Sequence, residues 1–447
     1  MSPFYLLEIR ISEDTTLFRT LLQTVCVLLA ASLFGRLARY LGQPRVIGEM
    51  VAGLVLGPSL LGYLAPNIFQ YVFAANSLLP LSILSQIGLI LLMFQIGLEF
   101  DFGHLRTEEN RRAISLIWLA GIGFPAILGA GFGWASHSTF SPGVPLFTYA
   151  LFMAVSLCIT AMPVLGRIMT ELKITRTRLG VLAITCAAFD DVMGWMLLAI
   201  ATALAQANMD LFLCAIRLTA LTLFLGVTWY FVRPGLRLLS SRVAQNGSLL
   251  SISLILAALF CSGLMTQLIG IHSIFGGFWA GVLLHQETEF VTWWRQRVGG
   301  LVGLLFVPLF FTFTGLRTNL PDLSSPDLWA WCLLLIGLAI LGKFGGCLWA
   351  ARWSGLPPAE ARCIAVLMNT RGLLELVVAN VGYELKIIPQ SIFTMLVFMA
   401  VLTTSFTTPC LRRWLPPISQ LTGRDLGPRR HNPQTLTAQA GASEIAD

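Results

Sequence analysis

The chain has 447 residues, of which 56% are hydrophobic and only 11% are charged, with a mean hydropathy of +0.77 and a formal net charge of +7. Soluble domains carry about 25% charged residues, so this composition excludes an ordinary soluble protein and predicts an all-α polytopic membrane protein. The basic residues follow the loops between apolar segments, and we therefore expect no nucleic-acid partner.

About thirteen apolar segments are long enough to cross a bilayer, which takes ~20 mainly apolar residues per helix. They are 17–41, 45–62, 80–98, 113–136, 146–168, 178–204, 210–232, 248–268, 270–286, 299–317, 327–350, 359–383 and 388–412. Together they define a transmembrane domain over residues 17–412. The segment 417–447 is polar and rich in Thr, Ala and Gly, and we expect it to be a disordered cytoplasmic tail.

The distribution of positive charge predicts the orientation in the membrane. If the N-terminus lies outside, most of the 29 Lys and Arg residues fall in cytoplasmic loops or in the tail, as the positive-inside rule requires. An odd number of helices then places the C-terminus inside. We therefore expect a multi-pass protein of the plasma or inner membrane, surrounded by the lipid bilayer.

Two classes of feature are missing from the sequence pattern. The first 16 residues contain acidic and basic side chains and lack a small-residue cleavage pattern, which argues against a removed signal peptide. The nine cysteines are scattered through apolar segments without a CxxC or Cys/His cluster, as expected for buried hydrophobic residues. We expect no resident cofactor and no enzymatic activity.

Two pairs of similar segments indicate an internal repeat. IGEMVAGLVLG at 47–57 resembles FGGFWAGVLLH at 275–285, and FQIGLEFDF at 94–102 resembles FTFTGLRTNL at 311–320. The members of each pair are seven predicted helices apart along the chain, and because this offset is odd they cross the membrane in opposite directions. Inverted repeats of this kind are typical of secondary transporters that expose one midplane site alternately to each side. Chance similarity between glycine-rich apolar helices is the alternative, and two matches in the same order weigh against it.

The repeat pairs segment 146–168 with segment 359–383, and both are interrupted. The residues at the interruptions are Ser156, Thr160 and Pro163 in the first segment and Asn369, Thr370 and Arg371 in the second. Broken helices present free carbonyls and helix ends to an ion at the midplane. A simple proline kink is the alternative for Pro163 alone. The matched interruptions predict two crossed, broken helices, with these residues supporting the breaks.

Three ionisable residues lie deep inside apolar segments. Asp190 and Asp191 are adjacent within 178–204, and Lys343 lies within 327–350. A charge near the bilayer centre costs roughly 3 kcal/mol or more. Consecutive helical residues point ~100° apart, so one aspartate can pair with Lys343 while the other faces a cation path. A purely structural ion pair would leave the second aspartate uncompensated. Protons and a metal cation would compete for the same oxygens, and the triad predicts cation and proton transport.

Other polar residues have plainer explanations beside the functional ones. Arg371 and Glu375 are spaced i, i+4 and can pair with each other, either as a structural brace for the broken helix or with a direct role in transport. Glu49 is interfacial or part of an inner funnel. His272 is expected to be a packed or interfacial histidine.

Six segments in chain order carry a further signal: PRVIGEMVAGLVLGPSLLG, LLMFQIGLEFD, TAMPVLGRIM, FDDVMGW, LGKFGG and NTRGLLEL. They resemble the signature segments of the second branch of the monovalent cation:proton antiporter superfamily. The resemblance covers roughly residues 17–412 and implies a six-helix core that moves against a dimerisation scaffold in a homodimer. The core would be 113–204 and 327–412, the scaffold 17–98 and 248–317, and the linker helix 210–232.

The resemblance also implies roles for individual residues. Asp191 would be the main carrier of cation and proton, Asp190 would pair with Lys343, and Thr160 would lie beside them in an unwound stretch. The two aspartates would hold the transported Na+ or K+. The Asp-Asp-Lys set resembles electrogenic sodium/proton exchangers, whereas NTRGLLEL also resembles plant-type exchangers, many of which handle potassium. The tail lacks the GxGxxG of the ligand-gating domain in Kef-type proteins.

Three rival functions fit the residues less well. An intramembrane aspartyl protease needs two aspartates on separate helices, which adjacent residues cannot provide. A passive channel does not need a titratable triad. An inverted-repeat symporter for an organic anion is the alternative that we retain, although its site would lack the Asp-Asp-Lys set. The leading prediction is an electrogenic antiporter that exchanges Na+ or K+ for protons by elevator-type alternating access.

Overall fold

The structure is a computed structural model that describes residues 3–74, 77–98, 111–172, 174, 177–206 and 211–415. Within these ranges every regular element is helical, and 11 helices are long and apolar enough to cross a membrane. The predicted all-α membrane architecture is thus confirmed. The tail expected at 417–447 lies outside the described residues.

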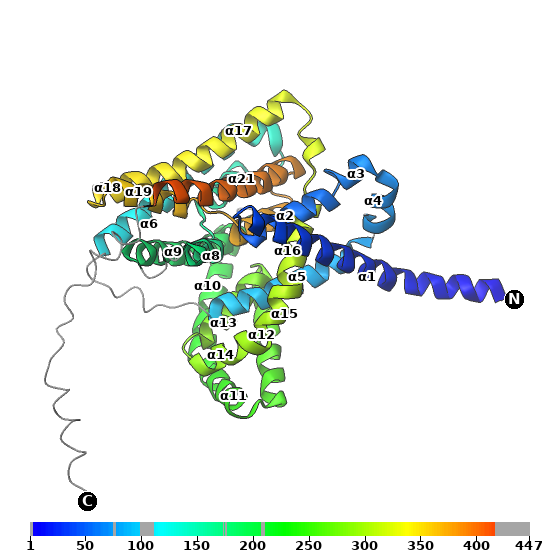
Figure 1. Ribbon diagram of the computed structural model, residues 1–447. Coiled ribbons are helices and arrows are strands. Elements are labelled where there is room, and N and C mark those ends of the chain that lie inside the picture. Colours follow the sequence, from blue (N-terminus) through cyan, green and yellow to red (C-terminus); the bar gives the residue numbers. More distant parts are fainter. Residues whose placement is uncertain are drawn as a thin grey trace, which may run out of the picture.

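The helices follow one another as a long chain of apolar segments (Figure 1). The first half contains α1 (Pro3–Tyr40), α2 (Arg45–Leu56), α3 (Leu61–Leu64), α4 (Pro66–Phe73), α5 (Leu79–Leu98), α6 (Arg111–Phe140), α7 (Leu146–Cys158), α8 (Met162–Glu171), α9 (Arg178–Gln206) and α10 (Leu211–Val227). The second half contains α11 (Arg233–Asn246), α12 (Leu249–Ile269), α13 (Ser273–Leu284), α14 (Thr288–Arg297), α15 (Gly299–Leu301), α16 (Val307–Leu316), α17 (Pro326–Ile340), α18 (Gly346–Trp353), α19 (Pro358–Met368), α20 (Leu373–Glu384) and α21 (Gln390–Trp414). The π-helical turns η4 (Thr228–Val232), η5 (Val302–Phe306) and η7 (Leu341–Gly345) join successive helices, and the 3₁₀ turn η6 (Leu320–Asp322) follows α16.

Every predicted apolar segment coincides with one or two of these helices. The count of thirteen spans is not confirmed, because segments 146–168 and 270–286 contain the shorter helices α7 and α13. The expected separation near Gly270 is present, since this glycine caps α12 in the left-handed conformation (φ 91°). The helix of the predicted linker extends past its expected end at residue 232. The helix continues through η4 and α11 to Asn246, because the basic residues after position 232 end the apolar run without ending the helix.

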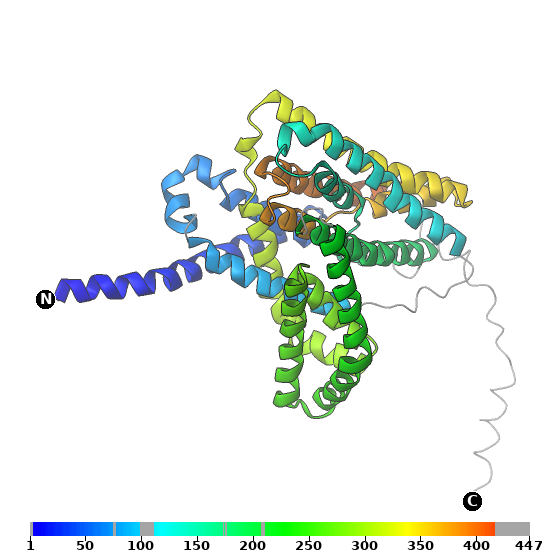
Figure 2. The same cartoon turned by 180° about the vertical axis from the view of Figure 1, so that it is seen from behind.

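Two helix crossings bring backbones into direct contact. Gly53 of α2 faces Gly315 of α16, and Gly281 of α13 faces Gly97 of α5. At each of the four positions an added methyl group would collide with backbone atoms of the facing helix. Small residues permit such close approach, which is how helices in lipid gain packing energy. Both crossings lie in the group formed by α1–α5 and α12–α16 (Figures 1 and 2).

These crossings follow the internal repeat position by position. Gly53 of IGEMVAGLVLG meets Gly315 of FTFTGLRTNL, and Gly281 of FGGFWAGVLLH, which is equivalent to Gly53, meets Gly97 of FQIGLEFDF. A second pair of equivalent contacts lies earlier in the same two segments, where Gly48 packs on the backbone of Phe34 in α1 and Gly276 packs on the backbone of Ser262 in α12. Chance similarity between apolar helices does not produce equal contacts at equivalent positions. The contacts therefore support the inverted repeat predicted from the sequence.

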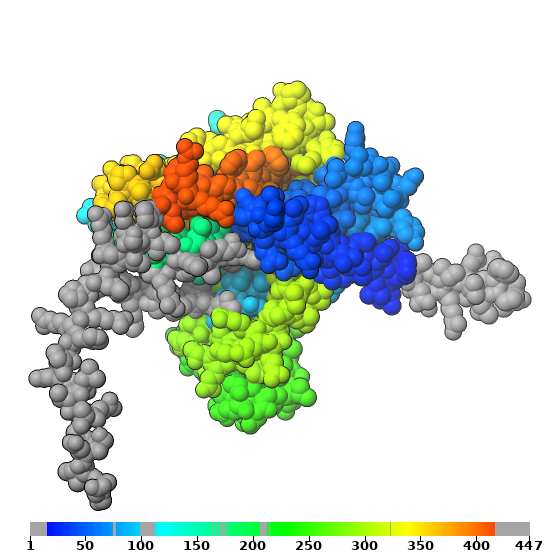
Figure 3. All heavy atoms as spheres, in the orientation of Figure 1, coloured from blue at the N-terminus to red at the C-terminus, as the bar shows by residue number. Residues whose placement is uncertain are grey.

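A second group of helices surrounds the broken segments. The helix α6 lies along α7, η7 and α18, while α9 packs on α6, α7 and α19, and α21 packs on α19 and α20. In Figure 1 these helices occupy the upper part of the molecule, above α10–α14. On the face in Figure 3, α1 and α2 (dark blue) lie between the orange α21 and the yellow-green stretch around α15 and α16.

Candidate functional site

Both predicted helix interruptions are present, and they touch. Residues 159–161 separate α7 from α8, and residues 369–372 separate α19 from α20. The backbone N–H of Ala161 donates a 2.9 Å hydrogen bond to the carbonyl of Thr370. Pro163 lies in the first turn of α8, where a missing amide donor is tolerated. The break therefore comes just before the proline and not at it.

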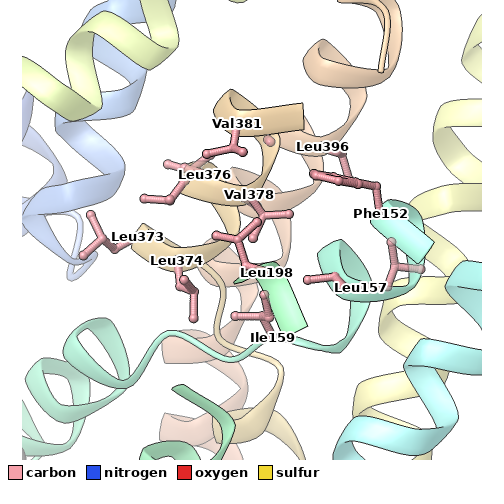
Figure 4. Close-up of a cluster of buried hydrophobic side chains, with 14 of the residues drawn as sticks. Phe152, Leu157, Ile159, Leu198, Leu373, Leu374, Leu376, Val378, Val381 and Leu396 are labelled. Carbon is pink, nitrogen blue, oxygen red and sulfur yellow. The ribbon is translucent and has the colours of Figure 1, made fainter. Parts of the chain in front are cut away.

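Apolar side chains pack tightly around the two breaks. Figure 4 shows Ile159 from the first break close to Leu198 of α9, with Leu373, Leu374 and Val378 of α20 in the same cluster. All five side chains are at most 4% exposed. Such packing excludes water from the surroundings of the breaks, and it strengthens electrostatic interactions between the polar groups enclosed there.

Lys343 and Asp190 form a fully buried ion pair beside the first break. The Nζ of Lys343 lies 2.6 Å from Oδ2 of Asp190 and also donates to the carbonyls of Gly121 (2.8 Å) and Cys158 (2.5 Å). All three ammonium protons therefore have acceptors. Lys343 lies in the π-helical turn η7, a helix irregularity that is frequent at functional sites.

Thr160 joins the same pair from the first break. Its hydroxyl lies 2.6 Å from Oδ2 of Asp190 and 2.9 Å from the carbonyl of Met368, which ends α19. A hydroxyl has one hydrogen, so it donates to one of these acceptors at a time. The structure thus brings Thr160, Asp190 and Lys343 together at the point where the two broken helices meet.

Asp191 lies next to this pair with a different environment. Its side chain is buried, with the residue 4% exposed, and it interacts with the backbone of Met162 at the start of α8. The positive end of a helix dipole favours an anion there. Among the described residues, Oδ1 of Asp191 and Oδ1 of Asp190 have no hydrogen-bond partner. A buried carboxylate oxygen without a partner is costly, and a proton or a metal cation is its chemical complement.

Arg371 connects the second break to the first broken helix. Its Nη1 and Nη2 donate to the carbonyls of Ser156 (2.9 Å) and Leu157 (2.8 Å), and its Nε lies 3.7 Å from Oε2 of Glu375. The last carbonyls of α7 carry the negative end of its dipole, which the guanidinium neutralises. The expected pair with Glu375 is present, but the shortest contacts of Arg371 go to the other broken helix, which sequence patterns could not foresee.

Thr404 of α21 holds the second break in place. Its hydroxyl accepts from the backbone N–H of Arg371 (2.9 Å) and donates to the carbonyl of the same residue (2.8 Å). The neighbouring Thr403 instead donates to Met399 within its own helix. Thr404 is not among the residues predicted from the sequence, although the hydroxyl-rich run LTTSFTT in an apolar helix is a signal for it.

The remaining predicted residues lie in or near the breaks with varied partners. The hydroxyl of Ser156 donates to Phe152 one turn earlier, so this residue serves the site through its carbonyl. Asn369 and Thr370 are buried, and within the described residues their side-chain oxygens have no hydrogen-bond partner. Away from the breaks, Glu49 of α2 is buried and pairs with Arg45 at 2.8 Å.

The profile of the family "Sodium/hydrogen exchanger, transmembrane" matches residues 27–415 of this chain. The chain is 36% identical over 413 residues to Cation/H(+) antiporter 17 of Arabidopsis thaliana, covering 91% of this chain and 49% of that protein. It is 37% identical over 409 residues to the Na(+)/H(+) antiporter NhaS4 of Synechocystis, a match that covers 90% of this chain and 99% of that protein. It is 31% identical over 406 residues to K(+)/H(+) antiporter 1 of Saccharomyces cerevisiae, a match that covers 89% of this chain and 46% of that protein. The chain thus spans about half the length of the Arabidopsis and yeast relatives.

A solved structure shares the fold. The sodium proton antiporter MjNhaP1 from Methanocaldococcus jannaschii superposes with a TM-score of 0.56 at 16% identity, covering 92% of this chain and 100% of that one. This likeness supports the fold, while the family rests on the profile and on the more similar relatives. The chain belongs to the sodium/hydrogen exchanger transmembrane family, within the monovalent cation:proton antiporter superfamily.

Proposed function

We propose that this protein is a secondary antiporter that exchanges Na+ or K+ for protons across the membrane. One observation carries the proposal: the buried Asp191 presents an oxygen without a hydrogen-bond partner in the described residues, beside the Asp190–Lys343 pair. A proton or a cation can satisfy this oxygen, but both cannot bind it at once. Competition for one site is the basis of exchange. The names of the relatives, which include sodium/proton and potassium/proton antiporters, agree with this chemistry.

In this proposal Asp191 is the principal carrier. Oδ1 of Asp190 on α9 and the hydroxyl of Thr160 in the first break are the further oxygen ligands in this proposal. Asp190 also balances the charge of Lys343, so that the carboxylate of Asp191 remains available to bind the cation or a proton. Selection between Na+ and K+ depends on cavity size and on the placement of carbonyl oxygens.

The proposed exchange moves net charge. One monovalent cation leaves its oxygens when protons return, one proton to Asp191 and a second to the Lys343–Asp190 pair as that pair breaks. Two protons against one cation make the cycle electrogenic and sensitive to membrane voltage, at ~2.3 kcal/mol per charge per 100 mV.

We propose that residues 113–204 and 327–412 form a core that moves as one body against a scaffold of residues 17–98 and 248–317. The glycine crossings support a rigid scaffold, because backbones in contact leave little room to slide. The bonds that tie α7, α20 and α21 together at the breaks support a core that moves without coming apart. The long helix of α10, η4 and α11 connects the two bodies.

The proposal includes a homodimer formed by the scaffold, with the N-terminus outside and the C-terminus in the cytoplasm of a plasma or inner membrane. The distribution of basic residues supports this orientation. Exposed leucines along α1 and α12, such as Leu29, Leu33, Leu264 and Leu268, are suited to lipid or to a second copy.

Transport by purified protein in liposomes tests the proposal. A sodium or potassium gradient should drive proton movement, read with an entrapped pH dye, without any organic solute. Liposomes with Asp191→Asn protein control for leakage. If no monovalent cation drives proton movement across the neutral pH range, the antiporter proposal is wrong.

A further inference from the structure

A polar cluster lies at the C-terminal end of α20, away from the two aspartates. The carboxylate of Glu384 accepts hydrogen bonds from Arg317 (3.0 Å) and Gln86 (3.2 Å), and Nε2 of His272 lies 3.7 Å from it. Gln86 belongs to α5, Arg317 directly follows α16, and His272 directly precedes α13. One carboxylate of a broken helix thus binds three helices of the proposed scaffold.

Arg317 is the second centre of this cluster. Its Nη1 also lies 3.3 Å from Oδ1 of Asn380, its Nη2 donates to the hydroxyl of Ser82 at 3.3 Å, and its guanidinium stacks on Phe313 at 4.4 Å. Asn380 and Glu384 are four residues apart and therefore share one face of α20. Arg317 joins that face of α20 to α5.

A small cavity lies under the cluster. The polar cluster and the apolar side chains of Leu89, Phe310 and Val377 line it, together with the buried Ser85. Its volume is ≈ 20 Å³, which is room for about one water molecule. Val377, on the same side of α20, lies closer to the break at 369–372. The lining of the cavity thus includes a residue between the cluster and the second break, and the cavity itself is too small for a hydrated cation.

We propose that this cavity is one end of the ion path and that the Glu384–Arg317 pair is its gate. The inference rests on the proposed alternating-access function. The gate is closed while the pair is intact and opens when α20 moves away from α5, α13 and α16. The side chains of Glu384, Arg317 and His272 are 30%, 23% and 21% exposed. A charge-assisted pair at such a half-buried position is specific in geometry and weak enough to break in each cycle. In the proposed orientation this end faces the outside.

Cysteine labelling tests the gate directly. A Ser85→Cys reporter in the cavity is exposed to a membrane-impermeant maleimide from the outer side, and labelling at position 85 is followed by peptide mass spectrometry. Glu384→Gln should raise the labelling rate roughly fivefold or more, because it removes a charge-assisted hydrogen bond. The charge swap of Arg317→Glu with Glu384→Arg should restore slow labelling. Glu287→Gln is the matched control, since it breaks an equally short pair with Arg237 (3.0 Å, Glu287 28% exposed) that lies away from α20.

Two results would overturn the gate. Labelling of the Glu384→Gln protein at the rate of the Glu287→Gln control is one, and fast labelling of the reporter in the presence of the intact pair is the other. Leu89→Cys is a second reporter if Ser85→Cys does not fold. Labelling requires no transport, so the two proposals fail separately. If labelling depends on the Glu384–Arg317 pair in a protein that does not exchange cations, the antiporter proposal is wrong, while the pair still controls access to the cavity.

Discussion

Lys343 pairs with Asp190 at 2.6 Å while the adjacent Asp191 remains outside that pair. Neighbouring residues on a helix point ~100° apart, so the two carboxylates enter different surroundings although they are consecutive in the chain. Oδ2 of Asp190 is held by an ammonium and lies beside a hydroxyl. Oδ1 of Asp191 has no hydrogen-bond partner within the described residues. In the proposed exchange, this asymmetry makes Asp191 the principal ion carrier and Asp190 the counter-ion of Lys343.

Asp191→Asn should abolish exchange and leave the protein folded. The amide keeps the size of the side chain but cannot alternate between a proton and a cation. The measurement is sodium- or potassium-driven proton movement in liposomes, with elution profile and melting temperature as controls for folding. Wild-type exchange by a monodisperse Asp191→Asn protein would remove this residue from the mechanism.

Lys343→Ala should lower the free energy of unfolding by roughly 3–5 kcal/mol, because it leaves the buried carboxylate of Asp190 without its counter-ion. The double variant with Asp190→Asn should recover part of this loss. Thermal unfolding in detergent measures both effects. A Lys343→Ala protein as stable as the wild type would show that the pair contributes nothing net.

Thr404→Val should destabilise the protein by about 1–3 kcal/mol, because the N–H and carbonyl of Arg371 lose their common partner. We also expect slower exchange, since the second break is less well held. Thr403→Val is the matched control, because Thr403 bonds only within its own helix. Equal melting temperatures for the two variants would contradict the role assigned to Thr404.

Gly53→Ala and Gly281→Ala should destabilise the protein to similar extents, by about 1–3 kcal/mol each, because each forces apart a crossing at an equivalent position of the repeat. Gly131→Ala in α6 is the control, since an added methyl group meets no neighbouring atom within 4 Å. Thermal unfolding distinguishes them. Strongly unequal losses at Gly53 and Gly281 would argue against equivalent crossings.

The exchange should respond to voltage, since two protons against one cation move one net charge per cycle. Currents on a solid-supported membrane, or sodium-driven proton flux under an imposed potassium/valinomycin potential, measure this response. Flux that is indifferent to voltage would mean one-for-one exchange. Lys343 would then act only as a permanent counter-ion.

The amino-acid sequence by itself determined the membrane class, the positions of the apolar helices and both interruptions. Hydrophobic length and helix-breaking residues are local properties, so they can be recognised without knowledge of distant contacts. It also predicted the pairing of Lys343 with an aspartate, because a charge buried in an apolar helix requires a partner. The repeat predicted equivalence between helices, although not which glycine meets which.

Only the tertiary structure decided the partners of individual groups. The guanidinium of Arg371 reaches the carbonyls of α7, which lie about 215 residues away along the chain, and Thr404 reaches the second break from another helix. The Glu384–Arg317 pair likewise joins two residues that are 67 positions apart in the chain. Local patterns specify which groups need partners, but the partner itself depends on how whole helices pack, and many distant polar groups could satisfy the same need.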